Sequence, residues 1–173
     1  PFKDMLYDYA DITARQAVRE IESIGGEIDD ATLKRVIDNA VAERHTFLMD
    51  DIERVTKDKI ASDTFGFETG LPLVEAITDG YALSPNRSKA FAETEQRNME
   101  NYVRIAIAEE SDVVAGVLVS DGMEFDEPCI NANGQVWSLE YAGEHLLQHP
   151  RCVRSFTYLT AEEVKSHGGI DEE

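Results

Sequence analysis

The sequence is short of positive charge. Lysine and arginine total 16 against 35 aspartate and glutamate residues, so the formal net charge is −19. A surface of this sign repels phosphate backbones, which argues against direct nucleic-acid binding and favours a basic protein as partner. A purely solubilising role for the acidic surface is the simpler explanation, and it stays open.

Signals for membranes, export and disulfide bonding are also missing. No apolar run approaches the roughly 20 residues that a helix needs to span a bilayer, so we expect no membrane partner. No basic-then-apolar signal peptide opens the chain. Two cysteines, Cys129 and Cys152, are too few for a disulfide scaffold. Without an export signal we expect free thiols or a metal site rather than a bridge.

The common catalytic motifs are absent from the sequence as well. There is no glycine-rich phosphate loop with its lysine, no Gly-x-Ser-x-Gly elbow and no His-Glu-x-x-His pair. We therefore expect a protein that is not an enzyme.

Apolar residues recur at three- and four-residue steps through the first part of the chain, which is typical of amphipathic helices. The pattern predicts one helix over about 5–24, ended by the glycine pair at 25–26. It predicts a second helix that Asp29 or Asp30 caps and that runs to about residue 59. That second helix is long for a globular protein.

The middle of the chain begins with a loop and returns to helix. Two glycines and a proline predict a loop over 62–72, and a short helix follows over 72–82. Ser84 as cap and Pro85 in the first helical position then predict a helix that ends near Ser111.

The pattern changes after this helix. Residues 113–120 are mostly β-branched and predict a short buried strand. Further strands are expected at 134–137 and 151–159, with a loop over 121–128 before the first of them and a helix at 138–147 between the two.

The predicted fold class is therefore α+β. We expect a mainly helical N-terminal part over 1–111 and a small C-terminal α+β module of short strands over 112–160. Residues 161–173 are expected to form a frayed polar tail.

Four candidate metal ligands stand in two short segments, Asp126-x-x-Cys129 and His149-x-x-Cys152. A tetrahedral zinc site takes Cys, His and sometimes Asp, and such a site can hold together a module with a small core. His145 is an alternative to Asp126 as the fourth ligand. Two buried reduced cysteines without metal, or a disulfide between them, remain alternatives.

A catalytic interpretation of the same segment is weaker. Cys129 or Cys152 with His149 has the residue types of a thiol hydrolase. Zinc deaminases pair His-x-Glu with Pro-Cys-x-x-Cys, whereas here Pro128-Cys129 has no cysteine three residues later. A small zinc- or thiol-dependent enzyme, a toxin-like module and a helical adaptor are the alternatives to a structural protein.

The order of the segments FAETEQRN, VSDGMEFDEPC, NGQVW and HPRCVRSF resembles the phage head morphogenesis family, the Mu F-like minor head proteins. The resemblance covers about residues 84–158. Glu93 stands where that family usually has arginine. The matching positions are Ala92, Thr94, Glu95, Asp121, Gly122, Asp126, Cys129, Asn133, Gly134, Trp137, His149, Pro150, Cys152 and Arg154.

The resemblance implies a minor capsid protein that associates with the portal protein or the major capsid protein. Such a protein acts in head assembly or DNA delivery. It would be found in the capsid interior of the virion, and in the host cytoplasm during assembly. The cysteines and the histidine would then clamp the C-terminal module.

Overall fold

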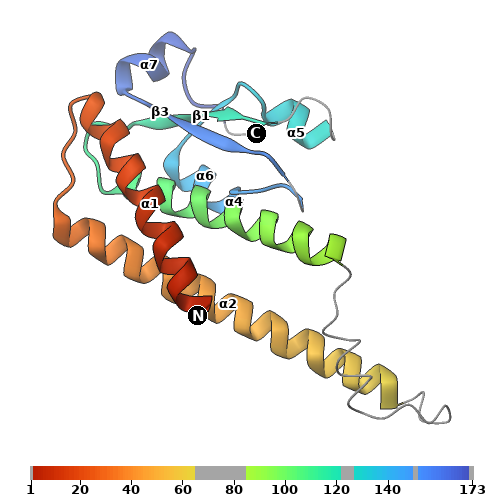
Figure 1. Cartoon of the computed structure of the whole chain (residues 1–173). Coiled ribbons are helices and arrows are strands. Elements are labelled where there is room, and N and C mark those ends of the chain that lie inside the picture. The colour runs from red at the N-terminus through yellow and green to blue at the C-terminus, as the bar shows by residue number, and fades with distance from the viewer. Residues whose placement is uncertain (1, 65–84, 122–126, 150–151, 172–173) are drawn as a thin grey trace.

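The computed structural model describes residues 2–64, 85–121, 127–149 and 152–171. Three long helices make up its larger part (Figure 1). They are α1 (Phe2–Ser23), α2 (Asp30–Thr64) and α4 (Pro85–Glu109). The loop expected at 62–72 lies mostly outside the described residues, and the short helix expected at 72–82 lies wholly outside them.

The expected end of α1 and the expected start of α2 are confirmed. Gly25 has a φ of 92°, and the N–H of Gly26 donates to the Ile21 carbonyl at 3.0 Å. A left-handed residue after the last turn is the usual way to end a helix. The carboxylate of Asp29 accepts from the Thr32 N–H at 2.8 Å and so caps α2. This helix reaches Thr64, a few residues beyond the expected end.

The three helices pack through small and branched side chains. Alanine on α1 lets the helices approach closely, and β-branched residues of α2 and α4 fill the space between them. The buried residues include Ala10, Ala14, Ala17 and Ile21 of α1, Val36, Ala40 and Val41 of α2, and Met99, Val103 and Ile107 of α4. Among the described residues, no helix has the length and apolar character needed to cross a membrane.

Three short antiparallel strands follow, in the spatial order β2-β1-β3. They are β1 (Gly116–Ser120), β2 (Val136–Trp137) and β3 (Ser155–Leu159). All three strands that the sequence predicts are present, each shorter than expected. In register, Val117 of β1 pairs with Trp137 on one side and Tyr158 on the other.

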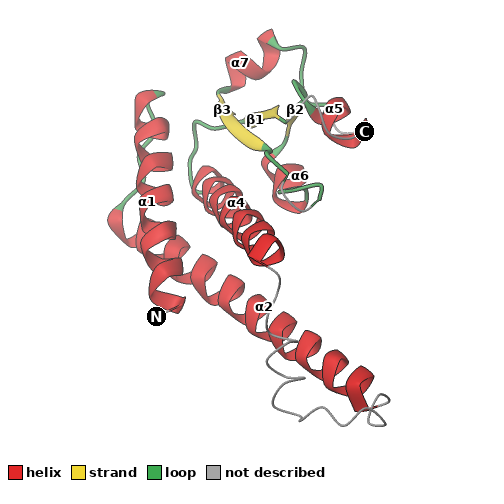
Figure 2. Cartoon of the chain, turned by 45° about the vertical axis from the view of Figure 1, so that its right-hand side comes forward, coloured by secondary structure: helices red, strands yellow, loops and turns green. Residues whose placement is uncertain are grey.

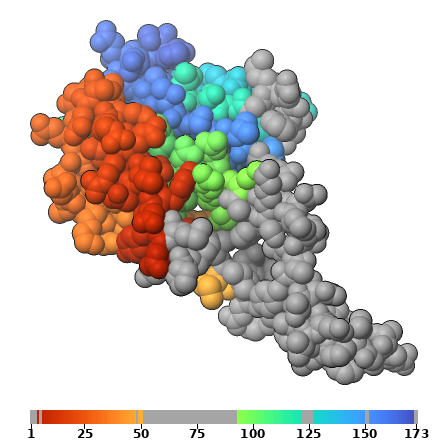
Figure 3. All heavy atoms as spheres, in the orientation of Figure 1, coloured from red at the N-terminus to blue at the C-terminus, as the bar shows by residue number. Residues whose placement is uncertain are grey.

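The sheet packs on α4, so the helices and the strands share one core. The Tyr158 hydroxyl donates to the Arg104 carbonyl at 2.8 Å, and the Arg104 guanidinium donates to the Phe156 carbonyl at 3.1 Å. Phe156 and Tyr158 belong to the same buried cluster as the helix residues. In Figure 3 the surface of the C-terminal part, in blue, adjoins that of the first helices without a break. The α+β fold with a helical N-terminal part is confirmed.

Three further short helices surround the sheet, and Figure 2 shows their positions. The expected α6 (Leu139–Glu144) lies on the α4 side of the sheet, and α7 (Ala161–Ser166) lies on the opposite side. The loop that the sequence predicts over 121–128 lies mostly outside the described residues, and α5 (Glu127–Ala132) begins at its last two residues. Proline in the first turn of a helix explains why this short segment can be helical.

The region expected to be a polar tail contains α7 and continues along the sheet. Thr160 and Glu163 form a capping box at the start of α7. Beyond the helix, the Asp171 N–H donates to the Val136 carbonyl at 2.6 Å. The tail is thus ordered against β2 as far as residue 171.

Candidate metal centre

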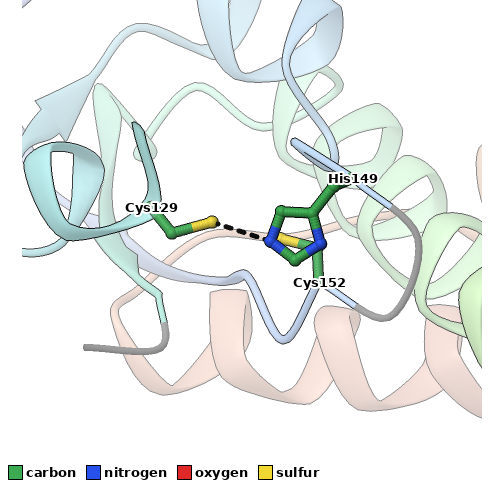
Figure 4. Close-up of side chains that lie close together, drawn as sticks. All are labelled: Cys129, His149 and Cys152. Carbon is green, nitrogen blue, oxygen red and sulfur yellow. Dashed lines mark hydrogen bonds between the residues drawn. The ribbon is translucent and has the colours of Figure 1, made fainter. Parts of the chain in front are cut away.

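Three of the four predicted ligands meet in space (Figure 4). Cys129 comes from α5, while His149 and Cys152 come from the loop between α6 and β3. Their ligand atoms all lie within 4.8 Å of one another. The closest pair is Cys129 Sγ and His149 Nε2, at 3.2 Å. The three side chains point toward a common centre, so this Cys–His–Cys group can hold a metal ion.

The group is shielded from solvent and has donor atoms suited to a soft metal. Cys129 is fully buried, Cys152 is 3% exposed and His149 is half-buried. No disulfide bond joins Cys129 and Cys152, so the disulfide alternative is not what the structure contains. Two thiolates and an imidazole are donors that suit Zn²⁺.

Among the described residues, no fourth ligand joins the group. Asp126 lies outside them. His145, the alternative, is not part of the group. Its ring stacks on Tyr141 at 4.0 Å, and its Nδ1 atom lies 2.8 Å from the Tyr141 carbonyl oxygen. A structural zinc site normally has four protein ligands, and this part of the chain supplies three.

A tight turn after α5 brings Cys129 to the centre. The Asn133 N–H donates to the Cys129 carbonyl at 3.1 Å and closes the last helical turn. Gly134 follows with a φ of 87°, and its N–H donates to the Val119 carbonyl at 2.8 Å. This conformation favours glycine. The Asn-Gly pair therefore fixes α5 against the end of β1.

A buried ion pair borders the cysteine group. The Cys152 thiol lies 3.5 Å from Asp121 Oδ1, and Arg154 Nε lies 2.8 Å from Asp121 Oδ2. The backbone N–H of Asp121 donates to the Asn133 side chain at 2.8 Å. The Arg154 guanidinium stands over the Trp137 ring, 4.9 Å from its centroid. Four residues singled out from the sequence thus lie around the metal ligands.

The other motif residues lie elsewhere or outside the described part. Gly122 lies outside it. Thr94 and Glu95 lie on α4, where Glu95 forms an ion pair with Arg44 of α2. Some of the motif residues thus lie at the interface between α2 and α4, and others lie around the Cys–His–Cys group. Glu93, which replaces the family's usual arginine, is exposed, and the guanidinium beside Glu95 comes from α2 instead.

Two buried polar residues of α4 were not predicted from the sequence. Asn101 is fully buried and donates from Nδ2 to the carbonyls of Leu146 and Arg154 at 2.9 and 3.0 Å. Arg104 is 7% exposed and donates to Glu20 of α1. In the sequence, each is a polar residue within a run of apolar residues at helical spacing. This pattern indicates a buried polar side chain, but it does not show which residue the side chain contacts.

The fold and the site define an α+β protein with a buried Cys–His–Cys group able to hold a metal ion. Comparisons with protein-family models, with curated proteins and with solved structures gave no match for the chain. The resemblance to phage minor head proteins therefore depends on the motif residues alone.

Proposed function

We propose that this chain is a structural, non-enzymatic component of a phage head that associates with the portal or major capsid protein. One observation carries the proposal. Residues that the resemblance singles out, spread along the sequence, belong to one connected cluster, most of which is buried. The cluster contains Asp121, Cys129, Asn133, Trp137, His149, Cys152 and Arg154. These residues match the phage minor head family in their order along the sequence, and they also lie together in space. The two observations together support a relationship to that family more strongly than the order alone.

In this proposal the metal is zinc and its role is structural. Cys129, His149 and Cys152 would hold it, with Asp126 as the fourth ligand. The sheet they adjoin has only three short strands, and one of them has two residues. Such a sheet buries little apolar surface by itself, so a bound metal would add much to its stability.

Metal content and stability of the purified chain test this role directly. We expect near-stoichiometric zinc by elemental analysis, and its loss in both Cys129→Ser and His149→Ala together with a lower Tm. His167→Ala, at an exposed histidine in the C-cap position of α7, is the matched control and should keep the zinc. A metal-free protein whose two thiols titrate after unfolding would contradict the zinc role.

The negative net charge of the chain favours a basic protein as its partner. A net charge of −19 favours docking to a positively charged surface and disfavours adhesion to packaged DNA. The test is co-expression of the full chain with the portal and major capsid proteins of the same phage. We expect co-purification that weakens with salt, because exposed charges are screened. A solitary monomer under these conditions would favour a free-standing helical adaptor.

A thiol-dependent enzyme is the second candidate function. The distance of 3.2 Å between Cys129 Sγ and His149 Nε2 favours it, because this is hydrogen-bond reach for a nucleophile and its base. The full burial of Cys129 opposes it, since a nucleophile must meet its substrate. Rapid alkylation of native, metal-free protein at Cys129 by iodoacetamide would favour the enzyme. Alkylation only after unfolding would exclude it.

A further inference from the structure

Two of the three candidate metal ligands, His149 and Cys152, lie in the loop between α6 and β3, whose described residues form no helix or strand. Among these described residues, one backbone hydrogen bond links the two ligands, from the Cys152 N–H to the His149 carbonyl at 3.1 Å. That bond does not fix where the two ligands lie relative to Cys129, which comes from α5.

A single side chain of α4 holds both ends of this loop. The Nδ2 amide of Asn101 donates to the Leu146 carbonyl at 2.9 Å and to the Arg154 carbonyl at 3.0 Å. Leu146 precedes His149, and Arg154 follows Cys152. Both N–H donors of one amide group therefore connect the residues that precede His149 to the residues that follow Cys152.

Arg154 provides a second connection across the same loop. Its Nη1 donates to the His145 carbonyl at 2.8 Å, and its Nε donates to Asp121 at the end of β1. Arg154 thus connects one end of the loop to the other and to the sheet. Of Arg154 and Asn101, only Asn101 connects the loop to one of the long helices.

The side chain of Asn101 is fully buried, and its Oδ1 atom has no hydrogen-bond partner among the described residues. A buried acceptor without a partner costs free energy that offsets part of the gain from the two donor bonds. An apolar side chain would avoid that cost, but it would leave the Leu146 and Arg154 carbonyls without this donor. The two donor bonds, and the position of the loop that they set, are therefore what Asn101 contributes.

We propose that Asn101 is a positioning residue that sets the metal affinity of the Cys129–His149–Cys152 group by fixing the ligand loop on α4. This inference rests on the metal site of the proposed function. A tetrahedral metal requires its ligands in place to within a fraction of an ångström, and residues that orient ligands typically contribute 10- to 100-fold to affinity. Asn101 also joins the helical part of the protein to the metal centre.

The experiment is a metal titration of the full chain below its unfolding transition. Zn²⁺ is titrated in competition with a chromophoric chelator, and Co²⁺ is titrated by absorption to report the coordination geometry. Asn101→Leu keeps the branching and the number of heavy atoms of the side chain and removes both donors. Ile107→Val is the matched control, because Ile107 is fully buried on the same helix and loses only a methyl group.

We expect Asn101→Leu to weaken Zn²⁺ binding by about 10- to 100-fold and to change the Co²⁺ spectrum. Ile107→Val should stay within about twofold of the wild type, as expected for a distant core change. Unchanged affinity in Asn101→Leu, or an equal loss in Ile107→Val, would overturn the inference. If Asn101→Leu fails to fold, Asn101→Ser carries the same test, because its hydroxyl is too short to reach both carbonyls. A wild type that binds no metal would overturn the metal site itself, a result distinct from an unaffected variant.

Discussion

Asp121 and Arg154 form an ion pair in which each side chain is only 1% exposed, with 2.8 Å between Arg154 Nε and Asp121 Oδ2. The pair joins the end of β1 to the residue just before β3. Two buried charges are costly to desolvate unless further hydrogen bonds satisfy them. Here the remaining carboxylate oxygen faces the Cys152 thiol, and the guanidinium also donates to the His145 carbonyl.

Removing one member of this pair should therefore be far more damaging than removing an exposed pair. We expect Arg154→Met to lower the free energy of unfolding by about 3–5 kcal/mol, because Asp121 would remain as a buried charge without its partner. Urea unfolding measures the loss. The control is Arg15→Met, which breaks an exposed pair with Asp11 and should change stability by about 0.5 kcal/mol or less. Similar losses in the two variants would contradict the role assigned to burial.

The contact between Glu20 of α1 and Arg104 of α4 predicts a dependence of stability on pH. Burial by itself would raise the pKa of Glu20, but the hydrogen bond and the charge of Arg104 outweigh it, so the pKa is lowered. A carboxylate with a lowered pKa stabilises the fold above its unfolded pKa, and this stabilisation disappears as the pH falls through the folded pKa.

Glu20→Gln should consequently be less stable than the wild type at pH 7. We expect a difference of about 0.5–1 kcal/mol, small because Glu20 is partly exposed and its charge is screened. The difference should shrink as the pH falls through the ordinary glutamate pKa of 4.5 and vanish below the folded pKa. Unfolding curves over this range measure it, with Glu22→Gln, at an exposed site on the same helix, as the control. A constant difference at all pH values would exclude the charge of Glu20 as the cause.

We expect glycine-to-alanine substitution to have opposite effects on the free energy of unfolding at Gly26 and at Gly143. A Cβ atom added at Gly26 would lie 2.6 Å from both Ile21 Cγ2 and Val113 Cγ2, whereas at Gly143 the nearest atom is Ile105 Cγ2 at 3.7 Å. Gly26→Ala should lower the free energy of unfolding by about 1–3 kcal/mol through overpacking. Gly143→Ala, inside α6, should raise it by about 0.5–1 kcal/mol, because alanine is the better helix former. Thermal unfolding compares the two, and a neutral Gly26→Ala would show that this turn can shift.

Local patterns predicted most of the fold, and the reason is visible at particular residues. The cap at Asp29, the proline that begins α4 and the β-branched residues before Ser120 each act on neighbours within a few residues, so sequence order alone is informative. The proximity of Cys129 to His149 and Cys152 was also predictable, since few residue types bind metals. The partners of Asn101 and Arg104 were not predictable, because each lies at least 45 residues away along the chain.

The single tryptophan offers a reporter for metal at the cysteine group. Trp137 contacts Arg154 and His145, which lie at the two ends of the loop that carries His149. Zinc at 100 times its Kd should raise the free energy of unfolding by about 2.7 kcal/mol, because the metal binds the folded state alone. A chelator should reverse this change and shift the Trp137 emission to longer wavelength as the loop loosens and water reaches the ring. His149→Ala should respond to neither zinc nor chelator. An equal response in that variant would mean that the stabilising metal binds at carboxylates elsewhere on this acidic surface, and the Cys–His–Cys group would then be a metal-free part of the core.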